Sequence, residues 1–354
     1  MARRAGLPLL LSCLWPLLGG AAGRCPGPAE RLGRAVSDPP GRAPGCGQPQ
    51  GWSLPLVAQD YLEILSHWYC RFGKCCKTGD CRIVNNITGL ELDLSQRLHG
   101  QHLAEKVILR AVQGFLETPQ PEKALALSFQ GWSGTGKSFV ARMIADHLYR
   151  DGLKSECVQV FISLFHFPHP KYVDMYKDQL KKQISETVQL CKQSLFIFDD
   201  VEKLHSGLLG AIEPYVDRYS SINEVDYRRS IFLFLSNIGG NTINQVALDF
   251  WRAGRAREEM TMEYLEQQLH TELLESTVGG FAENLIDFFV PFLPLEYHHV
   301  KLCVRDAFLA RSLPYTEDML EEMVKMMVFV PKEEQLFSAQ GCKSVSHRIH
   351  YVLP

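Results

Sequence analysis

The sequence lacks a large excess of charge of either sign. Its 354 residues carry a formal net charge of −3 at pH 7, and 22% of them are charged. Proteins that bind nucleic acid usually carry a marked basic excess, so this composition gives no reason to expect nucleic acid as a partner. With 46% hydrophobic residues the chain has enough apolar material for a large folded core, which excludes the disordered and fibrous classes.

Long hydrophobic runs are missing beyond the N-terminus. A membrane-spanning helix needs about 20 consecutive apolar residues. The run at residues 231–235 is only of strand length, and Pro291 and Pro294 interrupt the apolar residues between 288 and 295. We therefore expect the mature chain to be soluble and at most peripheral to a membrane.

The N-terminus has the features of a secretory signal peptide. A basic start precedes an apolar stretch at residues 7–18, and small residues at 21–23 form a cleavage site. The alternative, an uncleaved membrane anchor, is disfavoured because Pro8 and Pro16 interrupt a stretch that is too short to span a bilayer. We predict a signal peptide at residues 1–23.

Residues 24–50 are rich in proline and glycine and predict a flexible linker. Residues 51–94 follow as a cysteine-rich N-terminal segment, with an amphipathic helical stretch at 61–68. Its clustered cysteines are Cys70, Cys75, Cys76 and Cys81. They lack the paired C-x-x-C arms of a zinc site, so we favour disulfides, which fit an oxidising compartment. Asn86 opens an Asn-Ile-Thr sequon and is a candidate glycosylation site in a luminal chain.

From residue 95 onward, apolar strands alternate with helical patterns. The strand-like runs are 124–129, 158–164, 194–198 and 230–235, and the runs with helical spacing are 98–115, 138–149, 297–310 and 317–328. This alternation predicts an α/β fold, a parallel sheet flanked by helices. We divide this part into a large α/β nucleotide-binding domain at 95–289 and a small helical domain at 290–354.

A complete G-x-x-x-x-G-K-S motif follows the first of these strands. Its residues are Gly131, Trp132, Ser133, Gly134, Thr135, Gly136, Lys137 and Ser138. The glycines allow backbone N–H groups to face phosphate oxygens, and the next helix adds the positive end of its dipole. Lys137 is expected to contact the β- and γ-phosphates, and Ser138 to bind Mg²⁺. Because the motif lies between a strand and a helix, a chance match is disfavoured and a nucleoside triphosphate site is predicted.

Polar side chains also follow two later strands. Asp199 has the position of a Walker B aspartate that holds Mg²⁺, and Asp200 that of a catalytic base for the attacking water. The alternative is that Asp200 only caps the next helix. Asn237 ends the third strand; an asparagine there is usually a turn residue. In AAA+ proteins, however, such a residue, sensor 1, positions the water.

Together these motifs resemble the torsin family of AAA+ ATPases, and most of all its torsin-3 type. The segments that carry the resemblance are 119–137, 165–170, 284–287, 291–297 and 331–343. The resemblance implies an AAA+ P-loop fold, ATP and Mg²⁺ as cofactors, and residence in the lumen of the endoplasmic reticulum and nuclear envelope. It also implies that Lys343 is a sensor 2 residue on the small domain. Residues 100–102, Gly-Gln-His, resemble the base-contact region of Clp-type ATPases.

The resemblance also implies two cysteine pairs. Cys303 and Cys342 match a pair that flanks sensor 2, so a disulfide there is a candidate redox control of nucleotide affinity. The alternative is two buried free thiols. Cys70 and Cys191 match a pair that would join the N-terminal segment to the ATPase core.

The sequence departs from the family pattern at three places. Ser138 stands where the family usually has asparagine, which restores the ordinary Mg²⁺ ligand. Asp200 stands where glutamate is usual, so its carboxylate is one methylene shorter and hydrolysis is expected to be slow. Residues 281–284 span a segment in which the family commonly has several more residues.

Torsins resemble AAA+ machines that obtain their arginine finger from transmembrane activators of the lamina-associated polypeptide class. Arg252, Arg255 and Arg257 follow sensor 1 here, but charged residues on a helix face are more often solvated than catalytic. The aromatic-apolar-glycine pore motif is absent from residues 165–172, so polypeptide threading is not supported.

We expect a homo- or hetero-oligomeric, partner-activated ATPase that remodels protein assemblies. The alternative is a nucleotide-gated scaffold with negligible turnover; a small-molecule kinase fits the helical C-terminal unit less well.

Overall fold

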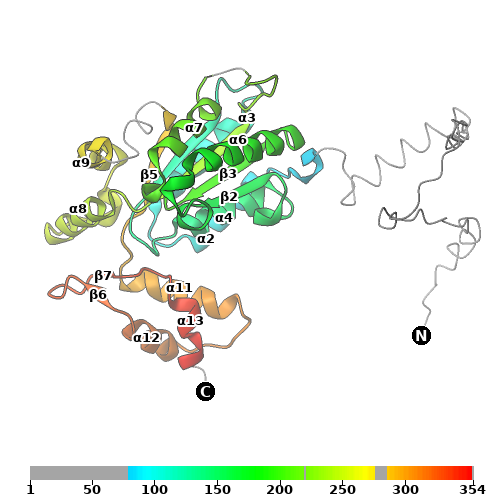
Figure 1. Ribbon diagram of the computed structural model, residues 1–354. Coiled ribbons are helices and arrows are strands. Elements are labelled where there is room, and N and C mark those ends of the chain that lie inside the picture. Colours follow the sequence, from blue (N-terminus) through cyan, green and yellow to red (C-terminus); the bar gives the residue numbers. More distant parts are fainter. Residues whose placement is uncertain (1–78, 219–220, 276–284, 353–354) are drawn as a thin grey trace, which may run out of the picture. The chain divides into compact units, whose positions relative to one another are not determined.

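The computed structural model describes residues 79–218, 221–275 and 285–352 (Figure 1). The predicted signal peptide, the linker, the helical stretch at 61–68, three of the four clustered cysteines and the shortened segment at 281–284 lie outside the described residues. Cys81 is described and is disulfide-bonded, in agreement with the preference for disulfides over zinc. All described residues belong to one compact unit, Leu56–Pro354.

Five parallel strands form the central sheet, in the order β2-β3-β4-β1-β5. They are β1 (Leu125–Gln130), β2 (Val158–Ile162), β3 (Ser194–Asp199), β4 (Ser230–Ser236) and β5 (Phe288–Pro291). The first four confirm the predicted strands. β5 was not predicted, because its short apolar run contains a proline. β2 ends two residues before the predicted strand does, because a short helix begins at Ser163.

Helices precede the first strand of the sheet and connect the later strands. The longer ones are α2 (Ile87–Arg97), α3 (His102–Glu117), α4 (Lys137–Leu148), α6 (Val173–Leu190), α7 (Ser206–Val216), α8 (Gly240–Arg252) and α9 (Met262–Glu275). The shorter elements are η1 (Gly79–Arg82), η2 (Gly152–Lys154), α5 (Ser163–His166), η3 (Pro170–Tyr172), η4 (Val201–Lys203) and η5 (Arg257–Glu259). The helix expected at 98–115 begins four residues later, because a loop with a positive φ at Gly100 separates α2 from α3. None of the described helices is both long and apolar enough to span a membrane.

The two faces of the sheet are covered by different helices. One apolar core joins α2, α3 and α4 to strand residues such as Leu127 and Leu233, and the other joins α6 and α7 to residues such as Phe198 and Phe234. Successive strand side chains alternate between these faces, so the β1 and β4 strands are buried throughout. This is the three-layer arrangement that the sequence predicts.

Aromatic side chains align across neighbouring strands. Phe198 is in register with Phe161 on β2 and with Phe234 on β4, and its ring stacks on both, at centroid distances of 4.9 and 5.4 Å. Burying each such ring contributes roughly 2–3 kcal/mol to the free energy of unfolding. The row fixes the register of the strands whose ends carry the acidic and amide side chains of the site.

The C-terminal residues form a smaller, mostly helical unit, coloured orange to red in Figure 1. It contains α11 (Tyr297–Leu309), α12 (Glu317–Lys325), α13 (Val345–Arg348), η6 (Ile349–Tyr351) and a hairpin of β6 (Phe329–Val330) and β7 (Phe337–Ser338). Val304, Phe308 and Met323 lie in its own apolar core. α11 and α12 confirm the two predicted helices, while the boundary placed at residues 289 and 290 remains a prediction.

One predicted disulfide is wrong. Cys191 does not pair with Cys70; it is bonded to Cys157. Cys157 immediately precedes β2 and Cys191 lies three residues before β3, and these strands are neighbours in the sheet, with Val158 opposite Leu195. The two Cα atoms are therefore only 5.5 Å apart, within disulfide reach.

Candidate nucleotide site

The glycine-rich motif forms a loop between β1 and α4. Gly131 has a φ of 142°, and a Cβ there would lie 2.4 Å from the carbonyl oxygen of Phe292, so only glycine fits. Helix α4 begins at Lys137, and Gly136 takes its N-cap position. Trp132 turns away and donates its indole N–H to Asn241 on α8, while the Thr135 hydroxyl donates to the Trp132 carbonyl. The loop therefore has the strand–loop–helix context that was predicted.

Lys137 is buried with its ammonium group held by three oxygens. Its Nζ donates to the carbonyls of Gly131 at 2.6 Å and Trp132 at 2.8 Å, and to Asn237 Oδ1 at 3.1 Å. Burial lowers its pKa to about 8, although the neighbouring carboxylates of Asp199, Glu202 and Asp200 oppose the shift. Each of the three N–H donors of this ammonium has an acceptor, and bound phosphate oxygens would replace some of these acceptors.

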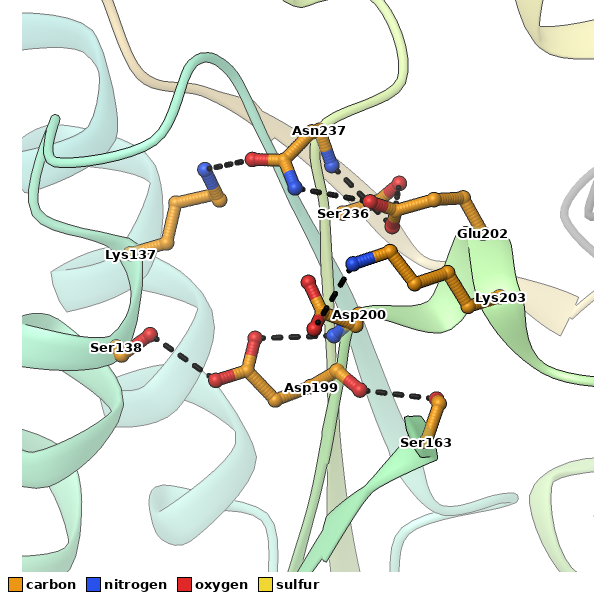
Figure 2. Close-up of polar contacts among 9 residues, drawn as sticks. All are labelled: Lys137, Ser138, Ser163, Asp199, Asp200, Glu202, Lys203, Ser236 and Asn237. Carbon is orange, nitrogen blue, oxygen red and sulfur yellow. Dashed lines mark hydrogen bonds and ion pairs between the residues drawn. The ribbon is translucent and has the colours of Figure 1, made fainter. Parts of the chain in front are cut away.

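Ser138, the residue after Lys137, lies opposite Asp199. The Ser138 hydroxyl donates to Asp199 Oδ2 at 3.2 Å (Figure 2). Asp199 is the last residue of β3, and its backbone carbonyl accepts from the hydroxyl of Ser163. A hydroxyl and a carboxylate beside a phosphate-binding loop are oxygen donors of the type that Mg²⁺ prefers. Both residues therefore lie together beside the loop, and metal binding by them stays a prediction.

Asp200 begins the connection between β3 and α7. Its φ of 57° is in the left-handed region, which Asp tolerates better than most residues. Its carboxylate lies 3.3 Å from Lys203 Nζ, and its backbone N–H donates to Asp199 Oδ1. The carboxylate of the predicted base is thus held by a neighbouring cation.

Asn237 follows β4 and lies between Lys137 and Glu202 (Figure 2). Its Oδ1 accepts from Lys137, and its Nδ2 donates to Glu202 Oε1 at 2.8 Å. The other oxygen of Glu202 accepts from the Ser236 hydroxyl at 3.0 Å and, at 3.4 Å, from the backbone N–H of Asn237. Sequence reasoning missed Glu202. The available signal is a third acid, two residues after Asp200.

The small domain contacts the P-loop directly. The backbone N–H of Cys342 donates to the Gly134 carbonyl at 3.0 Å, and Gly341 packs so closely that a Cβ on it would lie 2.1 Å from the same oxygen. Lys343 follows and lines the same cavity as Lys137. Cys342 is bonded to Cys303 on α11, which confirms the predicted pair. The disulfide therefore borders the cavity next to Lys343.

These elements enclose a cavity of about 1050 Å³. Residues 133–138 line it from the P-loop, Asp199, Asp200 and Asn237 from the strand ends, and Lys343 from the small domain. Leu98 and His99 also line it, whereas residues 100–102, which are predicted to contact the base, do not. Gln101 is instead buried, and its amide holds the Thr135 carbonyl and the backbone of Leu293.

The remaining predicted residues lie away from the cavity. Asn86 is exposed and caps the N-terminus of α2, its Oδ1 accepting from the Gly89 N–H. The three arginines after sensor 1 are all engaged within the chain. Their partners are Glu334 for Arg252, Glu259 and the Phe250 ring for Arg255, and Glu296 and the Gly100 carbonyl for Arg257.

Two family models match the chain: "Torsin" over residues 70–198, and "Torsin-1A, C-terminal domain" over residues 295–352. Human Torsin-3A is 61% identical over 312 residues, which cover 86% of this chain and 79% of the human protein. Torsin-3A of Rattus norvegicus is 58% identical over 313 residues, again covering 86% and 79%, and that of Mus musculus is 58% identical over 314 residues, covering 86% and 82%. The chain belongs to the torsin family.

Solved structures show that this torsin has the AAA+ fold. The Saccharomyces cerevisiae Hsp104–ADP complex matches with a TM-score of 0.55 at 18% identity, over 75% of this chain and 46% of the Hsp104 chain. A closed state of Hsp104 with ATPγS and FITC-casein matches with a TM-score of 0.54 at 17% identity, with the same coverage. The torsin chain thus spans less than half of the Hsp104 chain. The chain is therefore an AAA+ ATPase by its membership of the torsin family.

Proposed function

We propose that the chain binds ATP with Mg²⁺ in the cavity and hydrolyses it, weakly alone and faster with a partner, to remodel protein assemblies. The observation that carries the proposal is the convergence of four side chains, Lys137, Ser138, Asp199 and Asn237, on one cavity beside a P-loop. Lys137 neutralises phosphate charge, and Ser138 with Asp199 holds the metal. Mg²⁺, when bound, would neutralise charge on the β- and γ-phosphates.

We assign the catalytic arginine finger to a partner protein. An arginine finger stabilises the charge of the transition state and is worth about 10³–10⁵ in rate for related phosphoryl transfers. In the described part of the chain, Arg252, Arg255 and Arg257 have partners of their own and do not line the cavity. Arg97 and Arg305 do line it, but each is bound to a neighbouring acid, Asp93 and Asp306 respectively. We therefore propose an oligomeric ATPase activated by the luminal domain of a transmembrane protein of the lamina-associated polypeptide class.

The lumen of the endoplasmic reticulum and nuclear envelope is the proposed location. The N-terminal signal pattern supports it, and so do the disulfides Cys157–Cys191 and Cys303–Cys342, which persist in an oxidising compartment. The exposed amide of Asn86 is accessible for glycosylation there.

The side chain of Asp200, one methylene shorter than that of glutamate, favours a second candidate function. Asp200 is paired with Lys203, so nucleotide binding without turnover, a nucleotide-gated scaffold, is the alternative. The two functions are separated by measuring ATP turnover with and without an activator luminal domain that carries an accessible arginine. A matched domain with that arginine changed to alanine is the control. Stimulation by the first domain alone supports the ATPase, whereas tight ATP binding with no stimulation supports the scaffold.

A further inference from the structure

We infer that Glu202 is the positioning residue for Asn237: it fixes the side-chain amide so that Oδ1, an acceptor, faces the phosphate side of the cavity. The inference rests on the proposed function, because it assigns a role within ATP hydrolysis. Glu202 lies on η4, two residues after Asp200, and does not line the cavity. It therefore acts through Asn237 and not on the nucleotide.

The chemistry of the two neighbours determines the orientation of the amide. An ammonium group only donates hydrogen bonds, and an ionised carboxylate only accepts them. The Asn237 atom that faces Lys137 is therefore the oxygen, at 3.1 Å, and the atom that faces Glu202 is the NH₂ group, at 2.8 Å (Figure 2). A flipped amide would place N–H against ammonium and oxygen against carboxylate.

Glu202 binds other groups besides the side-chain amide of Asn237. Its second oxygen accepts from the hydroxyl of Ser236, which is buried at the end of β4, and from the backbone N–H of Asn237. The Ser236 hydroxyl in turn accepts from the backbone N–H of Ile238. One carboxylate thus fixes both the backbone and the side chain of the residue at the strand end.

Of the two residues that bind the Asn237 side chain, only Lys137 would gain a new partner when ATP binds. The phosphates compete with Asn237 Oδ1 and the P-loop carbonyls for the ammonium of Lys137, because they carry full charge. When Lys137 turns to them, Glu202 remains as the group that orients the amide. Oδ1 is then presented as the acceptor of a hydrogen bond from the attacking water. In this chain sensor 1 therefore orients the water and does not donate to the γ-phosphate.

The kinetic test uses Glu202→Gln, which keeps the side-chain volume, Glu202→Ala and Asn237→Ala. Single-turnover hydrolysis is measured with the activator domain, together with ATP affinity. We expect Glu202→Ala to reduce the rate about tenfold or more while affinity stays within about twofold, and Glu202→Gln, whose own amide can also flip, to give an intermediate rate. Glu213→Gln, an exposed glutamate on the same connection, is the matched control and is expected to match the parent.

The double variant decides whether Glu202 acts through Asn237. We expect Glu202→Ala with Asn237→Ala to be no slower than Asn237→Ala alone, since residues that act as one unit are not additive. An additional loss in the double variant would overturn the inference, because Glu202 would then have its own catalytic role. Equal losses of affinity and rate in Glu202→Gln would overturn it in favour of a purely structural role.

A second readout does not depend on turnover. Asn237 Nδ2 is observed by NMR in protein labelled with ¹⁵N-asparagine and saturated with Mg-ATPγS, with Asn237→Ala to assign the signal. We expect slow exchange of its amide protons in the parent and in Glu213→Gln, and fast exchange in Glu202→Ala. Unchanged exchange in Glu202→Ala would overturn the inference. Protected amide protons in a parent that never hydrolyses ATP would refute the proposed function and leave the positioning role standing.

Discussion

His99 Nε2 lies 2.6 Å from Asp306 Oδ2, and this pair joins the loop after α2 to helix α11 at the wall of the nucleotide cavity. The His99 side chain is only 8% exposed, so the contact is largely screened from water. Arg305 also binds Asp306 through Oδ1. Burial alone would raise the pKa of Asp306, but the hydrogen bond and charge of His99, together with Arg305, hold it below its ordinary value.

We expect this pair to hold the small domain in place before nucleotide enters. Asp306→Asn removes the charge and should weaken ATP binding about fivefold, which corresponds to roughly 1 kcal/mol. Asp318→Asn, an exposed aspartate on α12, is the matched control. Calorimetric affinities at neutral pH provide the check, and equal affinities for the two variants would show that the pair does not preorganise the site.

ATP affinity should depend on the protonation of Lys137. The pKa of about 8 lies below the ordinary value of 10.5, so the free protein loses this charge as the pH rises through about 8. Bound phosphates favour the charged form, so binding then requires proton uptake, and affinity should fall by up to about tenfold per pH unit above that value. Calorimetry between about pH 7 and pH 9, in two buffers of different ionisation enthalpy, measures both effects. Constant affinity without proton uptake would contradict the expectation.

Asp200→Glu is expected to raise activator-stimulated turnover several-fold, because the longer side chain reaches further toward the attacking water. Asp200→Asn should lower it by about 10² or more while ATP remains bound. Because glutamate tolerates a φ of 57° less well than aspartate, thermal unfolding is recorded alongside. A stable Asp200→Glu protein with neutral or reduced turnover would mean that Asp200 is not the base.

The Cys303–Cys342 disulfide should couple redox state to nucleotide affinity. Cys342 binds the P-loop through its N–H and precedes Lys343, so reduction frees the segment that carries Lys343. We expect a change of a few fold in ATP or ADP affinity, about 1 kcal/mol, across defined glutathione ratios. Cys303→Ser should abolish the dependence, whereas Cys191→Ser, which breaks the other disulfide, should retain it. A parent without redox dependence would show that the bond is structural.

Local patterns predicted most of the fold and of the site. Strands β1 to β4 are apolar runs separated by helix-length stretches, and Gly131 to Ser138 is a contiguous motif, so neighbouring residues carry the information. The sequence does not predict β5, because its four residues, which include Pro291, have little apolar pattern of their own. The strand depends on its pairing with β1.

Contacts between distant residues could not be predicted in the same way. His99 and Asp306 are 207 positions apart, and Glu202 and Asn237 are 35 apart. Neither pair has a sequence spacing that marks it, because the order of the strands and the packing of α11 bring the partners together. The Cys157–Cys191 bond is similar: it is explained by the adjacency of β2 and β3, which became visible only in the sheet.

ATP binding by the parent chain and by Lys137→Ala tests the central claim most directly. The mature protein is titrated with Mg-ATP by calorimetry, with Lys182→Ala as a control that removes an exposed lysine on α6. We predict saturable binding to the parent and to Lys182→Ala, and none detectable to Lys137→Ala, because the phosphate charge loses its main side-chain counterpart. Equal affinity of the parent and Lys137→Ala would contradict the assignment of this cavity as the nucleotide site.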